Sequence, residues 1–332
     1  MKKSNTVKMI ASLMLAALMT MGAAGCGDSS KTNADSASAS TSSAQSNTDE
    51  KSTEDQTTSE ARTSDDESQI NVDELIAGQK VMETSSCGDN ATYTLYENDV
   101  AVIEGTGKLT KPYGLNRTKT IFIGEGITEL DDECFYRYTW MNTVKLPSTL
   151  KKIGKSAFDE CTTLRSVWAP DGVTEIGERA FAVCSQMVEC RLPDTVTTMG
   201  ESVFQACEDM TKANLPSKLT TVPANTFYQC KSLESITIPS GATEIGNGAF
   251  NFCSSLEEMV IPAGVTSIGE NAFEYDKRIT NITIPASVEK IGKNAFFDWG
   301  ESQTITVEGK SERPSSWDYK WADKHTNVVW QG

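Results

Sequence analysis

Eight phenylalanines recur at one fixed interval of 23 residues, and this spacing constrains the fold more than any other feature of the chain. They are Phe135, Phe158, Phe181, Phe204, Phe227, Phe250, Phe273 and Phe296. A fixed period of this length indicates a solenoid, in which each repeat forms one coil that stacks on its neighbours. Stacked coils expose a long open surface rather than an enclosed pocket, so the spacing favours binding over catalysis.

Other positions keep the same period. A proline follows most of the phenylalanines by twelve residues, and an apolar residue precedes each by five, usually next to a glycine, as in Ile153-Gly154. Between six and eleven residues after each phenylalanine, apolar and polar residues alternate as in a half-buried strand. We therefore expect parallel strands roughly 4.8 Å apart. Each Ala-Phe pair is expected on a short helical turn that places the ring in the core.

These positions resemble the BspA-like bacterial subtype of the leucine-rich repeat, over roughly residues 87 to 330. The resemblance is carried by Cys161-Thr-Thr-Leu164-Arg-Ser-Val167, Val173-Thr-Glu-Ile176-Gly177-Glu-Arg-Ala180-Phe181 and Ile236-Thr-Ile238-Pro239. It implies a right-handed coil of short parallel strands with short helical turns, here with eight 23-residue repeats and a cap at each end. Some proteins that resemble this family are adhesins, so it also implies binding at a cell surface.

We divide the chain into five segments. They are a lipoprotein signal peptide (1–25), a lipidated cysteine with a disordered tether (26–80), an N-terminal β cap (81–123), the leucine-rich repeat solenoid (124–307) and a C-terminal cap (308–332). Residues 27 to about 69 are dominated by Ser, Thr, Asp, Glu and Ala without an aromatic residue, so they bury too little apolar surface to fold. Residues 70–83 leave open whether a short helix forms.

The first 26 residues indicate secretion. Lys2 and Lys3 precede an apolar run from Met9 to Ala24, and small residues stand before Cys26. This order is typical of a lipoprotein signal, in which the cysteine thiol receives diacylglycerol. The alternative is an ordinary cleaved signal, whereas a transmembrane helix needs a longer run of roughly 20 residues. We expect a lipid anchor in the outer face of the cytoplasmic membrane of a Gram-positive-type bacterium.

Five cysteines share the position three residues after a phenylalanine: Cys161, Cys184, Cys207, Cys230 and Cys253. Their parallel Cβ vectors and odd number do not suit disulfide pairing. A straight line of thiols does not offer the tetrahedral ligands that zinc requires. We therefore expect buried free thiols beside the phenylalanines. A disulfide stays open only for Cys87 with Cys134.

Signatures of catalysis are lacking in the sequence. The single histidine, His325, lies in the predicted C-terminal cap, so histidine-based triads and metal sites lack partners. The net charge of −16 offers no basic stripe for nucleic acid. We expect no enzyme activity, no cofactor and no metal. Trp317, Trp321 and Trp330 are interpreted as part of the cap, with a ligand platform as the alternative.

The outward strand positions, eight and ten residues after each phenylalanine, are where a ligand would bind. Lys145, Trp168 and Arg191 occupy the tenth position in three successive repeats. Trp and Arg often dominate binding energy, so these three are the candidate ligand-binding residues. The alternative is an idle surface on which the two cations contact the indole ring.

Two functions therefore stay open. One is a non-catalytic, adhesin-like lipoprotein that recognises a host or neighbouring-cell surface protein or glycan through its repeats. The other is a structural or accessory envelope lipoprotein that scaffolds another cell-wall component.

The lipoprotein interpretation predicts that Cys26→Ala abolishes lipid attachment, because the acylated thiol is then missing. Metabolic labelling with a fatty acid should mark the wild-type chain only, and the variant should accumulate as precursor or as released protein. Labelling of the variant would show that the anchor is not at Cys26.

Overall fold

The computed structural model describes residues 71–332 with the exception of residue 89. The predicted signal peptide, Cys26 and most of the predicted tether lie outside these residues. Within residues 70–83, whose structure the sequence left open, there is a short helix, α1 (Val72–Ile76), and the start of β1 (Val81–Ser86). Residues Ile76–Gly332 form one compact unit, and the following description concerns that unit.

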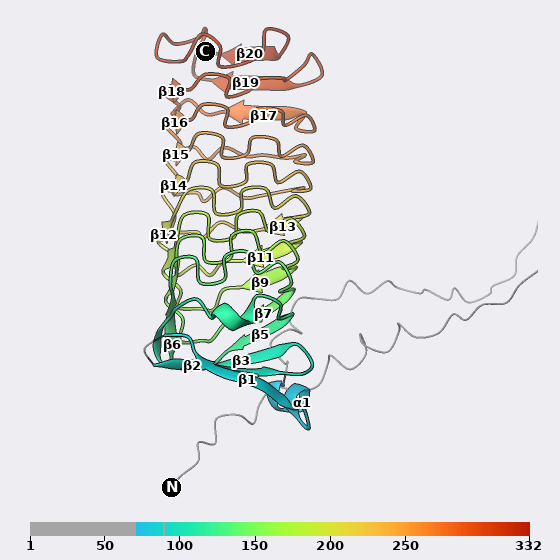
Figure 1. Ribbon diagram of the computed structural model, residues 1–332. Helices are drawn as coiled ribbons and strands as arrows, with labels where there is room; N and C mark the ends of the chain where they lie inside the picture. Colours follow the sequence, from blue (N-terminus) through green and yellow to red (C-terminus); the bar gives the residue numbers. More distant parts are fainter. Residues whose placement is uncertain (1–70, 89) are drawn as a thin grey trace, which may run out of the picture. The chain divides into compact units, whose positions relative to one another are not determined.

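The unit begins with an antiparallel meander and continues as a parallel coil (Figure 1). β1 pairs antiparallel with β2 (Ala91–Tyr96), which pairs antiparallel with β3 (Val100–Gly105). β3 then pairs parallel with β5 (Thr120–Ile123), and β5 with β7 (Thr143–Lys145). The change from antiparallel to parallel pairing at β3 marks the start of the coil, ahead of the first phenylalanine.

Most coils contribute to two stacks of parallel strands. The outer strand stack, which follows the phenylalanines, continues after β7 with β9 (Ser166–Trp168), β11 (Glu189–Arg191), β13 (Lys212–Ala213), β17 (Asn281–Ile284), β19 (Thr304–Glu308) and β20 (Asn327–Gln331). The return strand stack precedes the phenylalanines. It contains β4 (Gly107–Leu109), β6 (Ile127–Leu130), β8 (Lys152–Ile153), β10 (Glu175–Ile176), β12 (Thr198–Met199), β14 (Thr221–Val222), β15 (Glu244–Ile245), β16 (Ser267–Ile268) and β18 (Lys290–Ile291).

The parallel coil is longer than the eight expected repeats. β20 lies in the segment where we expected the repeat to be replaced, yet it pairs parallel with β19, with Thr304 opposite Asn327 and Glu308 opposite Gln331. That offset is again 23 residues. The phenylalanine disappears after Phe296, but the strand period continues because parallel pairing needs only the backbone and an apolar inner face.

The phenylalanines lie in turns rather than in the short helical turns that we expected. The residues two before and two after each of the eight have positive φ between 52° and 65°, as at Glu133 and Arg137 around Phe135. A left-handed residue interrupts a right-handed helix. The backbone instead bonds between coils: Phe158 N–H donates to the Ala180 carbonyl at 2.8 Å, and the same bond recurs along the stack.

The phenylalanine rings form one continuous buried stack. Neighbouring ring centroids are 5.2 to 5.8 Å apart with interplanar angles of 6° to 17°, and all eight side chains are fully buried. Tyr138 contacts the first ring edge-on, and Trp299 and Trp321 contact the last ring in the same way. Aromatic edges therefore cover both ends of the stack.

The cysteine column is buried and free, as expected, and it has a hydrogen-bonding role. All eight cysteines in the described part of the chain are free thiols, including Cys87 and Cys134. Each thiol of the column donates to the carbonyl of the phenylalanine 26 residues earlier, at 3.1 to 3.2 Å. At its two ends Tyr138 Oη donates to the Pro112 carbonyl (2.6 Å) and Trp299 Nε1 to the Phe273 carbonyl (2.8 Å). Burial raises the pKa of Cys161 and Cys207 to about 12, so these thiols stay protonated donors.

Asp276 takes the place of a cysteine in this column. Its side chain is fully buried; Oδ1 accepts a hydrogen bond from Cys253 N–H (2.8 Å), while Oδ2 has no partner. The same N–H reaches the Phe250 carbonyl at 3.0 Å, so the carboxyl group lies beside the acceptor that a thiol would use. Burial raises the pKa of Asp276 well above its ordinary range. Burial therefore favours the neutral carboxyl form, the only form of this side chain that has a proton to donate.

The ring stack predicts a large cost for removing one ring. Phe204→Ala should lower the free energy of unfolding by roughly 3–5 kcal/mol, because it leaves a cavity between two stacked neighbours. Lys212→Ala, at an exposed position eight residues further along the same coil, is the control. Chemical denaturation of the two variants checks this, and equal losses would contradict the assignment of the inward column.

Asp276 predicts a pH dependence. Because its pKa is higher in the folded than in the unfolded chain, its contribution to stability is complete below the unfolded pKa of about 4 and is lost as the pH rises through the folded value. Asp276→Asn keeps an acceptor and a permanent donor, so it should be more stable than wild type at pH 8 and nearly equal at pH 4. Melting curves across this range check it; a difference that is independent of pH would contradict a buried neutral carboxyl group.

Candidate functional site

The outer strand stack places the three predicted binding residues on neighbouring strands. Lys145 ends β7, Trp168 ends β9 and Arg191 ends β11, and Arg191 lies directly opposite Trp168 in the parallel register. The residues before them, such as Val167 and Cys190, point into the core and are buried. Lys145 and Trp168 are half-buried and Arg191 is exposed. The alternation of the strand therefore brings the three together on the outer face.

The contacts of these residues define what the patch offers. Arg191 Nε forms an ion pair with Glu189 Oε1 at 2.8 Å, which holds the guanidinium along its own strand. Trp168 Nε1 is buried and has no hydrogen-bond partner in the protein, so the indole is seated against the strands by packing. A ligand can reach the remaining ring surface and the two flanking cations.

Two further cations on the same face were missed by the sequence reasoning. Arg165 immediately precedes β9 and Lys212 begins β13, and both side chains are exposed. They occupy the seventh and eighth positions after the phenylalanine, whereas the prediction examined only the tenth. A column-by-column reading of charge would have found them.

The outer face changes character beyond β13 because the strand ladder is interrupted there. Leu192 N–H donates to Asn214 Oδ1 (2.9 Å), and Asn214 Nδ2 donates back to the Leu192 carbonyl (2.7 Å). One coil earlier the equivalent Ala169 N–H donates to a main-chain carbonyl, that of Arg191, at 3.0 Å. The Asn214 amide thus replaces the backbone of its own strand. The next two coils keep a single bridge, between Ser235 and Glu258.

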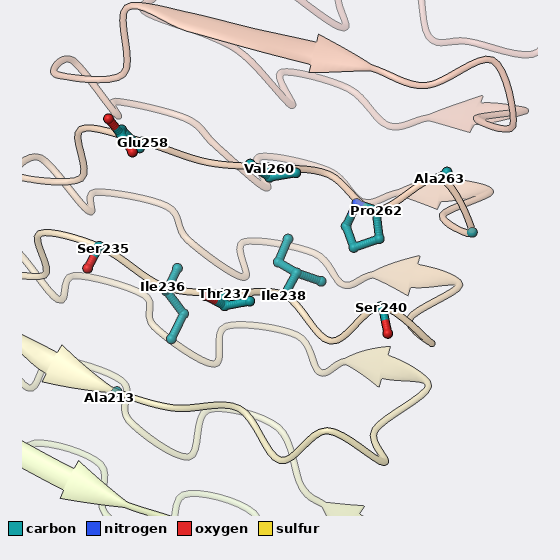
Figure 2. Close-up of a pocket in the computed structure, with 11 residues that line it drawn as sticks. Ala213, Ser235, Ile236, Thr237, Ile238, Ser240, Glu258, Val260, Pro262 and Ala263 are labelled. Carbon is teal, nitrogen blue, oxygen red and sulfur yellow. The ribbon is translucent and has the colours of Figure 1, made fainter.

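A depression of about 650 Å³ lies at this interruption (Figure 2). It is lined by hydroxyl, carboxylate and apolar side chains that include Ser235, Thr237, Glu258 and Val260. Val260 is 77% exposed, although it occupies the same outward column as Trp168. The sequence did not predict this depression. The nearby Asn214, whose side chain replaces backbone hydrogen bonds, belongs to no repeated pattern in the sequence.

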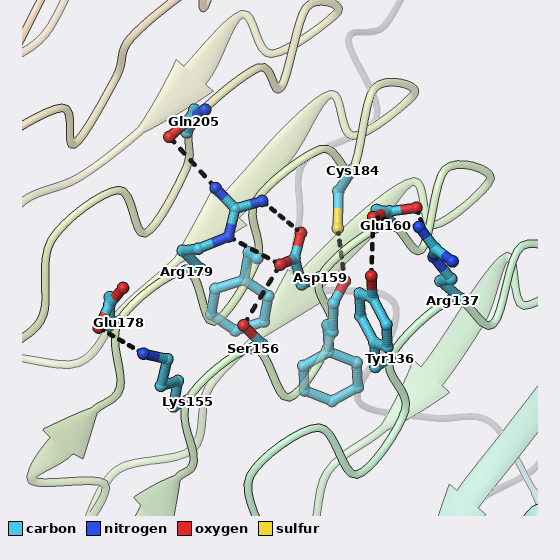
Figure 3. A network of polar contacts seen from close by, with 12 residues as sticks. Tyr136, Arg137, Lys155, Ser156, Asp159, Glu160, Glu178, Arg179, Cys184 and Gln205 are labelled. Atoms are coloured by element: carbon cyan, nitrogen blue, oxygen red, sulfur yellow. Dashed lines mark hydrogen bonds and ion pairs between the residues drawn. The ribbon is translucent and has the colours of Figure 1, made fainter.

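Polar residues on the turn side of the coils bond to one another (Figure 3). Arg179 makes two hydrogen bonds to the buried Asp159 carboxylate, at 2.9 and 3.1 Å. Glu160 accepts hydrogen bonds from Tyr136 (3.0 Å) and Arg137 (2.8 Å) of the preceding coil. These groups satisfy each other and link successive coils, so they support the stack rather than form a reactive site.

The described residues also bear on metals and membranes. In residues 71–332, residue 89 excepted, no group of three or more His, Cys, Asp or Glu side chains is placed to hold a metal ion. Within the same part of the chain, no helix has the length and apolar character needed to cross a bilayer.

Comparison with known proteins gives one family. The family described as "BspA type Leucine rich repeat region" matches in six copies over residues 113–234 and 184–303. No curated protein sequence matches the chain.

Three solved structures are similar to this fold. A leucine-rich repeat protein from Bacteroides ovatus is 22% identical with a TM-score of 0.59, over 76% of this chain and 66% of that one. The chain thus spans slightly less than two thirds of that protein. A leucine-rich repeat protein from T. pallidum is 20% identical (TM-score 0.45; 52% of this chain, 90% of that one). One from Eubacterium ventriosum is also 20% identical (TM-score 0.41; 74% and 84%). At these identities the likeness concerns the fold.

Proposed function

This chain belongs to the BspA-type leucine-rich repeat family, and on that premise we propose that it is a non-catalytic surface protein that binds its partner through the outer strand stack. The partner is a surface protein or glycan of a host or neighbouring cell. We further propose that Cys26 carries the lipid that anchors the chain outside the cytoplasmic membrane.

The observation that supports this function most is that the inward, turn and outward residues of a coil have different roles. The phenylalanines of the turns and the inward residues of the strands build the core, and the polar residues of the turns form bonds between coils. Outward strand residues lie outside the ring stack, although the Asn214 side chain bonds to the preceding coil. They nevertheless bring together a tryptophan and two cations, which are residue types suited to recognition.

Absence of catalysis is proposed on the same grounds. The buried thiols are protonated donors in the column, and burial of this kind makes a cysteine unreactive. Asp159, the buried carboxylate of the turn side, is held by Arg179. These buried titratable groups therefore have structural roles.

Binding through this face predicts that Trp168→Ala weakens attachment at least tenfold, because part of the indole is at the surface. The melting temperature should fall less than in Phe204→Ala, because the indole is only partly packed against the strands. The measurement is capture of the purified chain by an immobilised panel of extracellular-matrix proteins and glycans. Trp140→Ala, which removes a tryptophan that is 56% exposed elsewhere, is the matched control.

Unchanged capture of the Trp168→Ala variant would remove this patch from the binding surface. Protection of the wild-type chain from protease on intact cells, together with unchanged capture, would favour the scaffolding role within the wall.

A further inference from the structure

The outer strand stack is sorted by charge along the coil. Over residues 142–214 its outward positions, together with the exposed residue that precedes β9, carry four cations and one carboxylate, namely Lys145, Arg165, Arg191, Lys212 and Glu189. We call these five residues with Trp168 the basic face. Its excess of positive charge is local, since the whole chain has a net charge of −16.

The next part of the same stack has the opposite sign. Glu234, Glu257 and Glu258 are exposed in the coils that follow, and Glu258 lines the depression. Arg278 pairs with Glu257, which leaves two carboxylates in excess. A negatively charged ligand is therefore attracted to one half of the stack and repelled by the other.

From this distribution we propose that the basic face binds an anionic polysaccharide, with its carboxylate, sulfate or phosphate groups on the cations and a sugar ring against the exposed part of Trp168. This inference rests on the proposed function, because it assigns the ligand class of the same strand face. Arginine and lysine are the natural partners of such oxyanions, and arginine can bind them with two parallel hydrogen bonds.

The geometry suits an extended chain. Trp168 and Arg191 are directly opposite each other on parallel strands, which lie roughly 4.8 Å apart, and Lys145 ends the strand on the other side of Trp168. The cations therefore follow one another along the coil axis with the indole between them. A polymer with regularly spaced acidic groups meets several of these cations at once, and the weak exposed contacts add up.

A protein partner fits this face less well. β11 is paired on both sides, with β9 and with β13, so it offers no free edge on which a peptide could add as a strand. Apart from Trp168 and the exposed Val188, the outward side chains of residues 142–214 are charged or carry hydroxyl or amide groups. Cores of protein interfaces are instead depleted in charged residues, lysine and glutamate included.

The test uses the full chain and heparin as the anionic probe, with dextran as the neutral polysaccharide and poly-glutamate as the acidic peptide. We expect binding to heparin, no measurable binding to dextran and at least tenfold weaker binding to poly-glutamate. Affinity for heparin should fall at least fivefold between 50 and 300 mM NaCl, because exposed charges are screened by salt. Absence of heparin binding at 50 mM NaCl overturns the proposal, and equal binding of poly-glutamate overturns the polysaccharide class.

Two triple variants separate the basic face from net charge. Lys145→Ser, Arg165→Ser and Lys212→Ser together should weaken heparin binding at least tenfold. The control combines Lys231→Ser, Lys290→Ser and Lys293→Ser, which removes the same charge from exposed positions outside the face and should change affinity less than twofold. Equal losses in the two triples overturn the proposal. Circular dichroism melting verifies that both triples are folded.

A gain-of-binding variant guards against trivial loss of structure. Glu189→Gln removes the one carboxylate of the face and should tighten heparin binding at least twofold; unchanged or weaker binding contradicts the role of the face.

The failure of this inference is distinguishable from failure of the proposed function. If heparin does not bind while Trp168→Ala still weakens capture by the ligand panel, the strand face remains the binding surface and only the ligand class is wrong.

Discussion

Hydrogen bonding of each coil to the next is the interaction on which the whole structure depends. At the turn, a phenylalanine N–H donates to the carbonyl that precedes the next phenylalanine, as from Phe135 to Ala157 at 2.7 Å. This bond places successive rings 5.2 to 5.8 Å apart, which is within the range for favourable aromatic packing. An inserted residue would break both the bond and the ring stack, and this explains why the period stays at 23 residues.

Because the coils bond to one another in register, equivalent positions of successive coils must meet the same structural need. The column beside the rings needs a donor for the carbonyl 26 residues earlier, and tyrosine, cysteine and tryptophan all supply one. Asp276 can supply one only in its neutral form, and burial favours that form by raising the pKa of the carboxyl group. Outward strand positions escape this requirement, so they can carry charge and aromatic groups for recognition.

The periodicity of the sequence predicted the parallel strands, the buried rings and the free thiols. Each of them follows from residues of one kind that recur every 23 positions. One expectation was wrong. The helical turn around Phe135 is excluded by left-handed residues such as Glu133, whose conformation does not follow from its side chain. The glycine next to Ile176 has a role that the sequence did not show, because a side chain on Gly177 would collide with the backbone of the preceding coil. Contacts between coils decided both.

The sequence by itself determined the solenoid, the parallel stacking of its strands and which strand residues face outward. The 23-residue period and the alternation of apolar and polar residues can both be read along the chain. The sequence also placed Lys145, Trp168 and Arg191 on one face. Only the tertiary structure decided how far the coil extends, since β20 continues the pairing without a phenylalanine. It alone decided where the ladder is interrupted, since β13 has no paired strand on its far side among the described residues. Beside its last paired residues, the Asn214 side chain takes over bonds of Leu192 that a backbone carbonyl makes elsewhere. Such a choice depends on the distance between two strands, which a single strand's residues do not encode.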